Sequence, residues 1–209
     1  VRTRLTVGFG VVCVLLVASV VMGLMGMGRM GADLKAVVAD HFPRIVAAAN
    51  LSTQIDVIAI ALRNMMLNAD AADRERQTQV IAQSRQEVVR LFDTLDKTLT
   101  EPKDRALLQK VKEQRALYLA GQEELLGFIR SDQTDQSREY LASKLRPVLA
   151  SYKASIGALV ESEKNAIVTA GTDARDTALN ARNTLIGLGV AALLLAAALG
   201  WLTTRSLVR

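Results

Sequence analysis

Two long runs without a charged side chain frame the sequence and constrain its fold more than any other feature. Residues 5–28 contain no charge over 24 positions, and residues 184–204 contain none over 21. A helix needs about 20 apolar residues to cross the hydrocarbon core of a bilayer. The first run is also longer than the apolar core of a secretory signal, so we interpret it as an uncleaved anchor. The sequence therefore predicts two membrane-spanning helices with residues 29–183 between them.

The charges beside these runs predict how the chain crosses the membrane. Arg2 and Arg4 precede the first run, and Arg205 and Arg209 follow the second. Positively charged flanks remain on the cytoplasmic side. We therefore expect residues 1–4 and 205–209 in the cytoplasm and residues 29–183 on the opposite side of the membrane.

The intervening segment has the composition of a helical domain with a balanced charge. Outside the four terminal arginines, 22 basic residues accompany 21 acidic ones, which argues against the clustered basic surface of a nucleic-acid-binding protein. Half of the chain is apolar, only 4% is aromatic, and there are three prolines. Small and unbranched side chains lose little freedom in helices, so this composition favours an all-α fold.

Four helices are predicted between the membrane-spanning runs, over about 29–69, 74–99, 102–130 and from near 136 onward. In each of them apolar residues recur three or four positions apart. Long helices with short polar connections predict an antiparallel up-down four-helix bundle, whose first and last helices continue into the membrane helices.

Individual residues refine these helices. Phe42, Ala49, Ile55 and Leu62 are among the residues expected on the buried face of the first helix, and Leu117 on that of the third. Helix ends and bends are predicted by three others: Pro43 should bend the first helix, Thr100 should cap the third, and Pro102 should lie in its first turn.

The sequence lacks the motifs of common catalytic and metal sites. It has one histidine, His41, and one cysteine, Cys13, so the paired Glu-x-x-His motifs of a di-iron bundle cannot form. Zinc hydrolase, nucleotide-binding and nucleophile-elbow motifs are also missing. We therefore expect no enzyme activity, no cofactor and no metal. His41 is expected to be a partly exposed helix residue, with pH sensing as the alternative.

A candidate binding site begins with Arg63, the single charge in residues 57–69. Arg63 is four residues after Ala59 and three before Met66, so the three share one helical face. An arginine on an apolar face needs a carboxylate partner or must reach water. The partner would be either an anionic ligand or an acidic residue of the protein.

The start of the last helix adds Arg138, Tyr140, Lys144 and Arg146. In an antiparallel bundle this start lies at the same end as Arg63. Several cations and a phenol would suit a small organic acid, although each side chain could equally be a solvated surface group.

The order of these segments resembles the front half of bacterial methyl-accepting chemotaxis proteins. The stretches "ALRNMMLNAD" (61–70), "EYLASKLR" (139–146) and "TTRSLVR" (203–209) carry the resemblance. It implies a two-pass protein of the bacterial inner membrane with a periplasmic sensor bundle and both termini in the cytoplasm. It also implies a homodimer with the ligand bound at the membrane-distal dimer interface between the first helices, and a small displacement of the last helix toward the cytoplasm on binding. A HAMP domain that begins at residues 205–209 would then control a histidine kinase through its adaptor.

Departures from the family pattern affect the expected ligand. Arg63 matches the last of three arginines used by amino-acid-binding members, but Gln54 and Ala59 stand at the other two positions. Tyr140 matches the family's aromatic residue, and Arg138 and Arg146 are additions that could replace the missing cations. A di- or tricarboxylate is therefore favoured over an amino acid. The alternatives are a bundle that docks a protein or binds no ligand, and the input domain of a sensor histidine kinase or cyclase.

Overall fold

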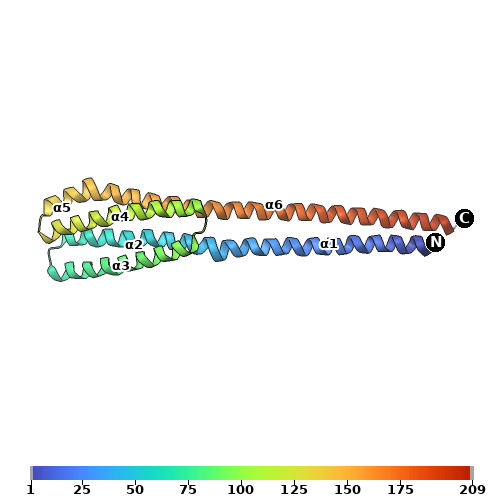
Figure 1. The fold of residues 1–209 in the computed structure, drawn as a ribbon, viewed down its shortest axis with the longest axis horizontal. Coiled ribbons are helices and arrows are strands. Elements are labelled where there is room, and N and C mark those ends of the chain that lie inside the picture. The colour runs from blue at the N-terminus through green and yellow to red at the C-terminus, as the bar shows by residue number, and fades with distance from the viewer. Residues whose placement is uncertain (1, 208–209) are drawn as a thin grey trace. The chain divides into compact units, whose positions relative to one another are not determined.

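A computed structural model describes the backbone of residues 2–207, and their side chains except at positions 2–9, 11, 12, 15, 27, 29, 30, 33, 34, 36, 199 and 202–207. The described chain is helical apart from short connections, which confirms the all-α prediction (Figure 1). Its elements are α1 (Arg2–Ala36), the π-helix η1 (Val37–His41), α2 (Phe42–Leu67), α3 (Ala71–Thr98), α4 (Pro102–Arg130), α5 (Thr134–Tyr140), the π-helix η2 (Leu141–Leu145) and α6 (Arg146–Leu207).

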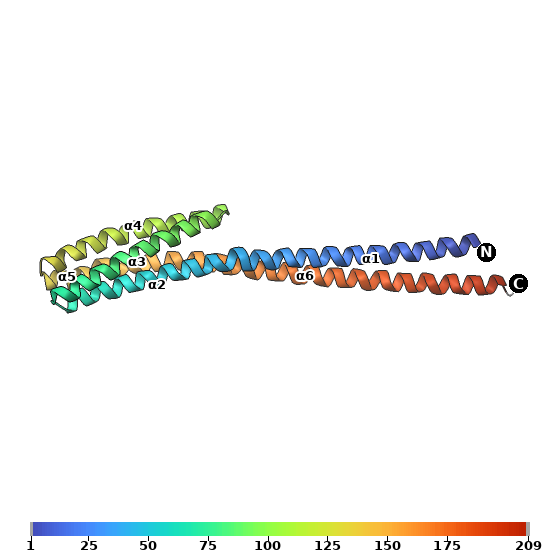
Figure 2. The same ribbon diagram turned by 90° about the horizontal axis from the view of Figure 1, so that it is seen from below.

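The chain forms two compact units, of which Val38–Ile167 is a four-helix bundle. Figures 1 and 2 show α2, α3, α4 and the segment that leads from α5 into α6 alongside one another, with the chain direction reversing at each connection. The predicted antiparallel up-down bundle is therefore confirmed.

The core of the bundle is built from apolar side chains of all four helices. Leu51, Leu95, Leu125 and Leu159 are among those that are almost fully buried. At roughly 1.5–3 kcal/mol for each large apolar side chain removed from water, this core is the main source of the bundle's stability.

The predicted buried face of the first helix was partly wrong. Ile55 and Leu62 are buried, but Phe42 is 59% exposed and Ala49 is exposed as well. The reason is that α2 is apolar around most of its circumference, so periodicity alone could not select the face that packs inward. Leu117 of α4 was also predicted to be buried and is 55% exposed.

The connections follow the polar breaks in the sequence. After α2 ends at Leu67, the Asp70 carboxylate accepts a hydrogen bond from the backbone N–H of Asp73 and caps α3. Pro102 lies in the first turn of α4 as predicted, but the N-cap is Glu101 and not Thr100. The Thr100 prediction was wrong because Pro102 itself occupies the first helical position, which leaves Thr100 one residue outside the cap.

Two prolines coincide with the two π-helical segments. Pro43 follows the end of η1 by two residues, and Pro147 follows the end of η2 by two residues. Proline lacks the N–H that would bond the carbonyl four residues earlier, and its ring collides with that carbonyl in a regular α-helix. A wider π turn removes the collision at both places. A π-helical segment thus precedes Pro43, the position where a bend was predicted.

The second unit contains α1, the first residue of η1 (Val37), and α6 from residue 168 onward. Many of its described apolar side chains are exposed, including Val17, Leu24, Val190 and Leu193. A Cβ atom added to Gly26 would lie 3.8 Å from the Cβ of Ala181, so small residues let these two helices approach closely. Exposed apolar surface of this extent suits lipid contact.

Two stretches are long and apolar enough to cross a membrane, Thr134–Ala198 and Val37–Leu67. None of the most apolar part of Thr134–Ala198 is buried, whereas 39% of that of Val37–Leu67 is buried, as expected for a core helix of the bundle. Leu16–Gly26 is a shorter apolar stretch within the predicted first span, several of whose side chains are outside the described residues. These features fit a membrane protein.

The residues on which the predicted orientation rests are not described. The side chains of Arg2, Arg4 and Arg205, and all of Arg209, lie outside the described part of the chain. The orientation of the chain and the assignment of residues 205–209 therefore stay predictions.

Candidate functional site

The seam between α2 and α6 is held by an ion pair at mid-height of the bundle. Lys153 Nζ of α6 lies 2.8 Å from both carboxylate oxygens of Asp56 of α2. The two side chains are 39% and 48% exposed, so the pair borders solvent. Because the two helices run antiparallel, this contact defines which residues of α2 and α6 lie at the same level.

Two arginines lie at equal distances along the chain from this ion pair. Arg63 lies seven residues after Asp56, and Arg146 lies seven residues before Lys153. Both intervals are regular α-helix. Seven residues are close to two full turns and about 10.5 Å of rise, so each arginine projects from the same face of its helix as the ion pair. Arg63 and Arg146 therefore lie at one level of the α2–α6 seam.

Both arginines are exposed, and neither guanidinium has a hydrogen bond or ion pair with any described residue. Arg63 reaches solvent, which was one of the alternatives for an arginine on an apolar face; Ala59 and Met66 beside it are half-buried. Ile60 and Leu67 of α2 are exposed. By contrast, Arg85 is bonded to Gln122 and paired with Glu123.

Two unpaired cations at one level repel each other, and a bound anion would relieve that repulsion. A guanidinium group binds a carboxylate through two parallel hydrogen bonds. Two such groups across a helix seam can therefore hold one molecule that carries two or more carboxylates. The exposed position leaves access to solvent open.

Tyr140 points elsewhere. Its hydroxyl donates a hydrogen bond to Glu124 Oε2 of α4 at 2.9 Å, and its ring packs at 5.5 Å from the ring of Phe128. Burial, followed by the hydrogen bond and the negative charge of Glu124, raises the pKa of Tyr140, so the phenol keeps its proton. The structure thus ties Tyr140 to α4 rather than to the α2–α6 seam.

Arg138 is the fourth predicted site residue and is exposed in the last turn of α5. Its guanidinium lies 3.6 Å from Asp135 one turn earlier, a loose surface contact. Arg63 and Arg146 therefore share one level of the α2–α6 seam, whereas Tyr140 and Arg138 make other contacts.

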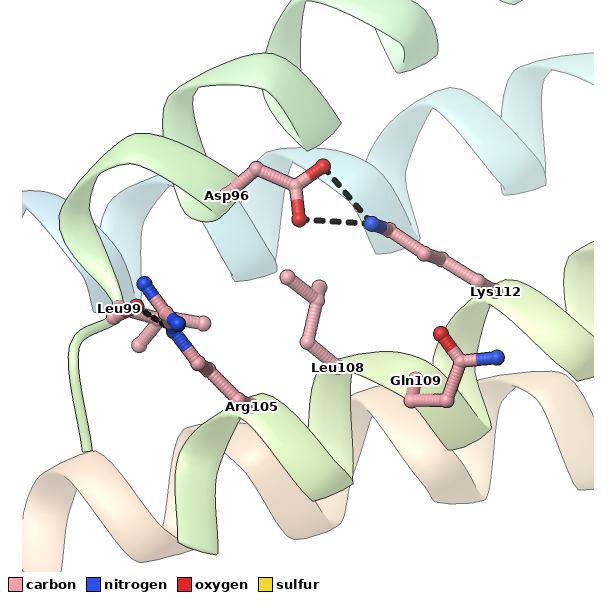
Figure 3. Close-up of a pocket in the computed structure, with 6 residues that line it drawn as sticks. All are labelled: Asp96, Leu99, Arg105, Leu108, Gln109 and Lys112. Carbon is pink, nitrogen blue, oxygen red and sulfur yellow. Dashed lines mark hydrogen bonds and ion pairs between the residues drawn. The ribbon is translucent and has the colours of Figure 1, made fainter. Parts of the chain in front are cut away.

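A pocket of about 330 Å³ lies between α3 and α4 near their connection (Figure 3). Its polar groups already bond within the protein. Lys112 Nζ contacts both oxygens of Asp96 at 2.6 and 2.8 Å, and Arg105 Nε donates to the carbonyl of Leu99 at 3.0 Å. Because these groups are satisfied, the pocket offers less to an anionic ligand than Arg63 and Arg146 do.

Sequence reasoning missed the residues that position these side chains. Asp56 and Lys153 set the register of the seam, and Glu124 holds Tyr140. The equal seven-residue spacing from Asp56 to Arg63 and from Arg146 to Lys153 was the available signal. Among the described residues, no group of three or more His, Cys, Asp or Glu side chains is arranged to hold a metal ion.

Comparison with known proteins agrees with this architecture. A family model described as a four helix bundle sensory module for signal transduction matches residues 1–178 of the chain. No curated protein matches it.

Proposed function

The chain belongs to the four-helix-bundle sensory modules for signal transduction, and we propose that it is the input part of a transmembrane chemoreceptor for a small organic acid. A di- or tricarboxylate is the proposed ligand, bound in the periplasm. The module itself acts by binding and conformational change, without catalysis.

The observation that carries this proposal is that Arg63 and Arg146 lie at the same level of the α2–α6 seam. Both are unpaired among the described residues, both are exposed, and the Asp56–Lys153 ion pair places them at one level. Arg138 and Lys144 add positive charge near the same end of the bundle. A single carboxylate needs one guanidinium, so two favour a ligand with at least two carboxylates.

Signal transmission follows from the elements that carry the two arginines. A ligand that bridges Arg63 and Arg146 favours one relative position of α2 and α6, and α6 is a single helix from Arg146 to Leu207. A preference of about 1–3 kcal/mol between two packings is sufficient for signalling. We propose that α6 passes this displacement through the inner membrane to a HAMP domain and a histidine kinase with its adaptor.

The receptor is proposed to be a homodimer with both termini in the cytoplasm. Exposed apolar side chains along η1 and α2 support a second copy as the partner, namely Val38, Phe42, Val46, Ile60 and Leu67. Contiguous exposed apolar side chains of this kind mark interaction sites, and a second copy would cover them.

The test is calorimetric titration of the full chain in lipid nanodiscs. Succinate, malate and citrate are compared with acetate, aspartate and serine. We expect at least one di- or tricarboxylate to bind, and the Arg63→Ala and Arg146→Ala variants each to lose at least about tenfold in affinity, since each removes a charge-assisted bidentate contact. Light scattering on the same samples reports the oligomeric state.

Arg90→Ala is the matched control, because Arg90 is an exposed arginine of α3 whose one ion-pair partner among the described residues is Glu87 of its own helix. It should bind like the wild type. Binding that is unchanged in Arg63→Ala and Arg146→Ala would refute the proposed site. A chain that binds no solute would favour the alternative of a protein-docking or ligand-free bundle.

A further inference from the structure

The single histidine of the chain takes part in a buried polar contact at the η1 end of the bundle. His41 Nδ1 lies 2.7 Å from Glu163 Oε2, which joins η1 to α6. Arg44 Nη1 lies 3.7 Å from the other oxygen, Oε1, of the same carboxylate. We term His41, Arg44 and Glu163 the proximal cluster, because they lie at the end of the bundle where η1 begins it.

The cluster is deeply buried and incompletely bonded. Glu163 is only 1% exposed, and the side chain of Arg44 is 10% exposed. Among the described residues, neither Glu163 Oε1 nor Arg44 Nε has a hydrogen-bond partner. The energetic cost of burying such a carboxylate depends strongly on the charge of its neighbours. His41 retains 16% exposure, so protons from water can reach the imidazole.

The buried charges near this end of the bundle do not balance while His41 is neutral. The bundle has three buried charged residues among those described, Arg44, Asp104 and Glu163. Asp104 of α4 accepts a hydrogen bond at 2.8 Å from Ser162, the neighbour of Glu163. With both carboxylates ionised, the formal charge of this set is −1, and a proton on His41 brings it to zero.

Other charged groups on the neighbouring elements are exposed. On α3, Asp96 pairs with Lys112 and Lys97 pairs with Asp93. The remaining ones within a few residues of the cluster are Lys35 on α1, Asp40 on η1, Glu101, Lys103 and Arg105 on or before α4, and Glu161 and Lys164 on α6. Solvent screens these groups, so the buried charges interact more strongly with the His41 side chain than the exposed ones do.

We propose that the proximal cluster makes the contact between η1 and α6 dependent on pH, with protonation of His41 locking the two segments together. The neutral imidazole forms one ordinary hydrogen bond to Glu163. The imidazolium forms a charge-assisted bond and cancels the excess buried negative charge. Acid supplies the proton that forms the imidazolium, so the contact strengthens as the pH falls.

The location of the cluster gives the contact a regulatory consequence. It joins the segment just before α2 to α6, the helix proposed to move during signalling. A stronger contact between His41 and Glu163 opposes a displacement of α6 along α2. Acid therefore favours the locked packing whether or not an organic acid is bound at Arg63 and Arg146.

The test is hydrogen exchange of the full chain in lipid nanodiscs without any organic acid, at pH 5.5 and 7.5, with rates corrected for intrinsic pH dependence. We expect amides in residues 37–45 and 158–167 to be about fivefold more protected at pH 5.5, the low end of coupling between sites in proteins. In His41→Gln, which cannot take up a proton, the two pH values should give equal protection.

Two further variants keep the result interpretable. Glu163→Gln removes the charge that His41 contacts and should also abolish the pH effect, even if His41→Gln is poorly folded. His41→Arg carries a permanent charge and should be protected at both pH values. A pH effect that persists in both His41→Gln and Glu163→Gln would overturn the proposal. So would an effect of equal size in residues 60–67 at the far end of α2.

Discussion

At the scale of single residues, the bundle retains buried polar groups without partners. The rings of Tyr118 and Tyr152 lie 5.9 Å apart in the core, and both side chains are almost fully buried. Neither hydroxyl has a hydrogen-bond partner among the described residues. Burial, before any charged neighbour, raises the pKa of both phenols above the ordinary value of 10.0. Packing of the rings therefore compensates for the unpaired hydroxyls.

These tyrosines predict an unusual response to removal of their hydroxyls. Near pH 7 the double variant Tyr118→Phe with Tyr152→Phe should unfold no more easily than the wild type, with a gain of up to about 1 kcal/mol. Above about pH 10 the unfolded wild-type chain releases both phenol protons while the folded chain keeps them, so wild-type stability falls as the pH rises. The double variant should lose the part of this fall that Tyr118 and Tyr152 cause.

Thermal unfolding in detergent at pH 7 and 10.5 checks the prediction. Tyr140→Phe is the matched control, because its hydroxyl does donate a hydrogen bond to Glu124. That change should lower stability at pH 7 by about 0.5–1 kcal/mol. A double variant that is as destabilised as the control would mean that the buried hydroxyls have bonding partners in the folded protein.

At the scale of the elements, one π-helical segment joins α1 to α2 and the other joins α5 to α6. They precede Pro43 and Pro147, whereas Pro102 opens α4 without one. A π turn adds one residue relative to the α-helical repeat and rotates the helix before it by about 100° relative to the helix after it. The η2 segment therefore sets the direction of Tyr140 relative to Arg146.

Replacing Pro147 should restore a regular helix at this point. In Pro147→Ala the new N–H can bond the carbonyl of Ser143, and the π turn loses its cause. We expect slower hydrogen exchange in residues 141–150, and loss of the Tyr140–Glu124 hydrogen bond as α5 rotates. Exchange measured by mass spectrometry tests the first effect, and a crystal structure of the variant tests the second.

Pro102→Ala is the control for this change, because a proline in the first turn replaces no intrahelical hydrogen bond. Its exchange pattern should match that of the wild type. An unchanged η2 in Pro147→Ala would show that packing against α4, rather than the proline, maintains the π turn.

At the scale of the whole molecule, α2 and α6 differ from α3 and α4 because they continue as helices beyond the bundle. The helical chain from α1 through η1 into α2 has no loop, and α6 is helical through residues 165–184, where Gly171 does not interrupt it. The α3 and α4 helices belong to the bundle alone. Mechanical transmission needs such an unbroken element, because a flexible linker would absorb a small displacement.

An inserted flexible segment should therefore separate binding from transmission. With Gly-Ser-Gly-Ser inserted after Asp173, we expect the organic acid to bind with wild-type affinity. The change that the acid causes in hydrogen exchange of residues 185–198 should be lost. The same insertion after Thr100, in the connection between α3 and α4, is the control and should preserve both. A response in residues 185–198 that survives the first insertion would refute transmission along α6.

Local signals in the sequence were sufficient for the elements of this protein. The predicted helix over 102–130 is α4, and the polar breaks near residues 68 and 131 coincide with observed connections. The uncharged runs, the low aromatic content and the scarcity of proline pointed to an all-α bundle flanked by apolar helices. These features act within a few residues of one another, which is why they can be recognised without the fold.

Tertiary structure alone decided which residues meet. The Asp56–Lys153 pair joins positions 97 apart in the sequence, and the His41–Glu163 contact joins positions 122 apart. Helical periodicity identifies apolar faces, but the register between two helices depends on how side chains from both interlock. For the same reason the sequence could name Arg63 and Arg146 as candidates, while only packing placed them at one level and turned Tyr140 toward Glu124.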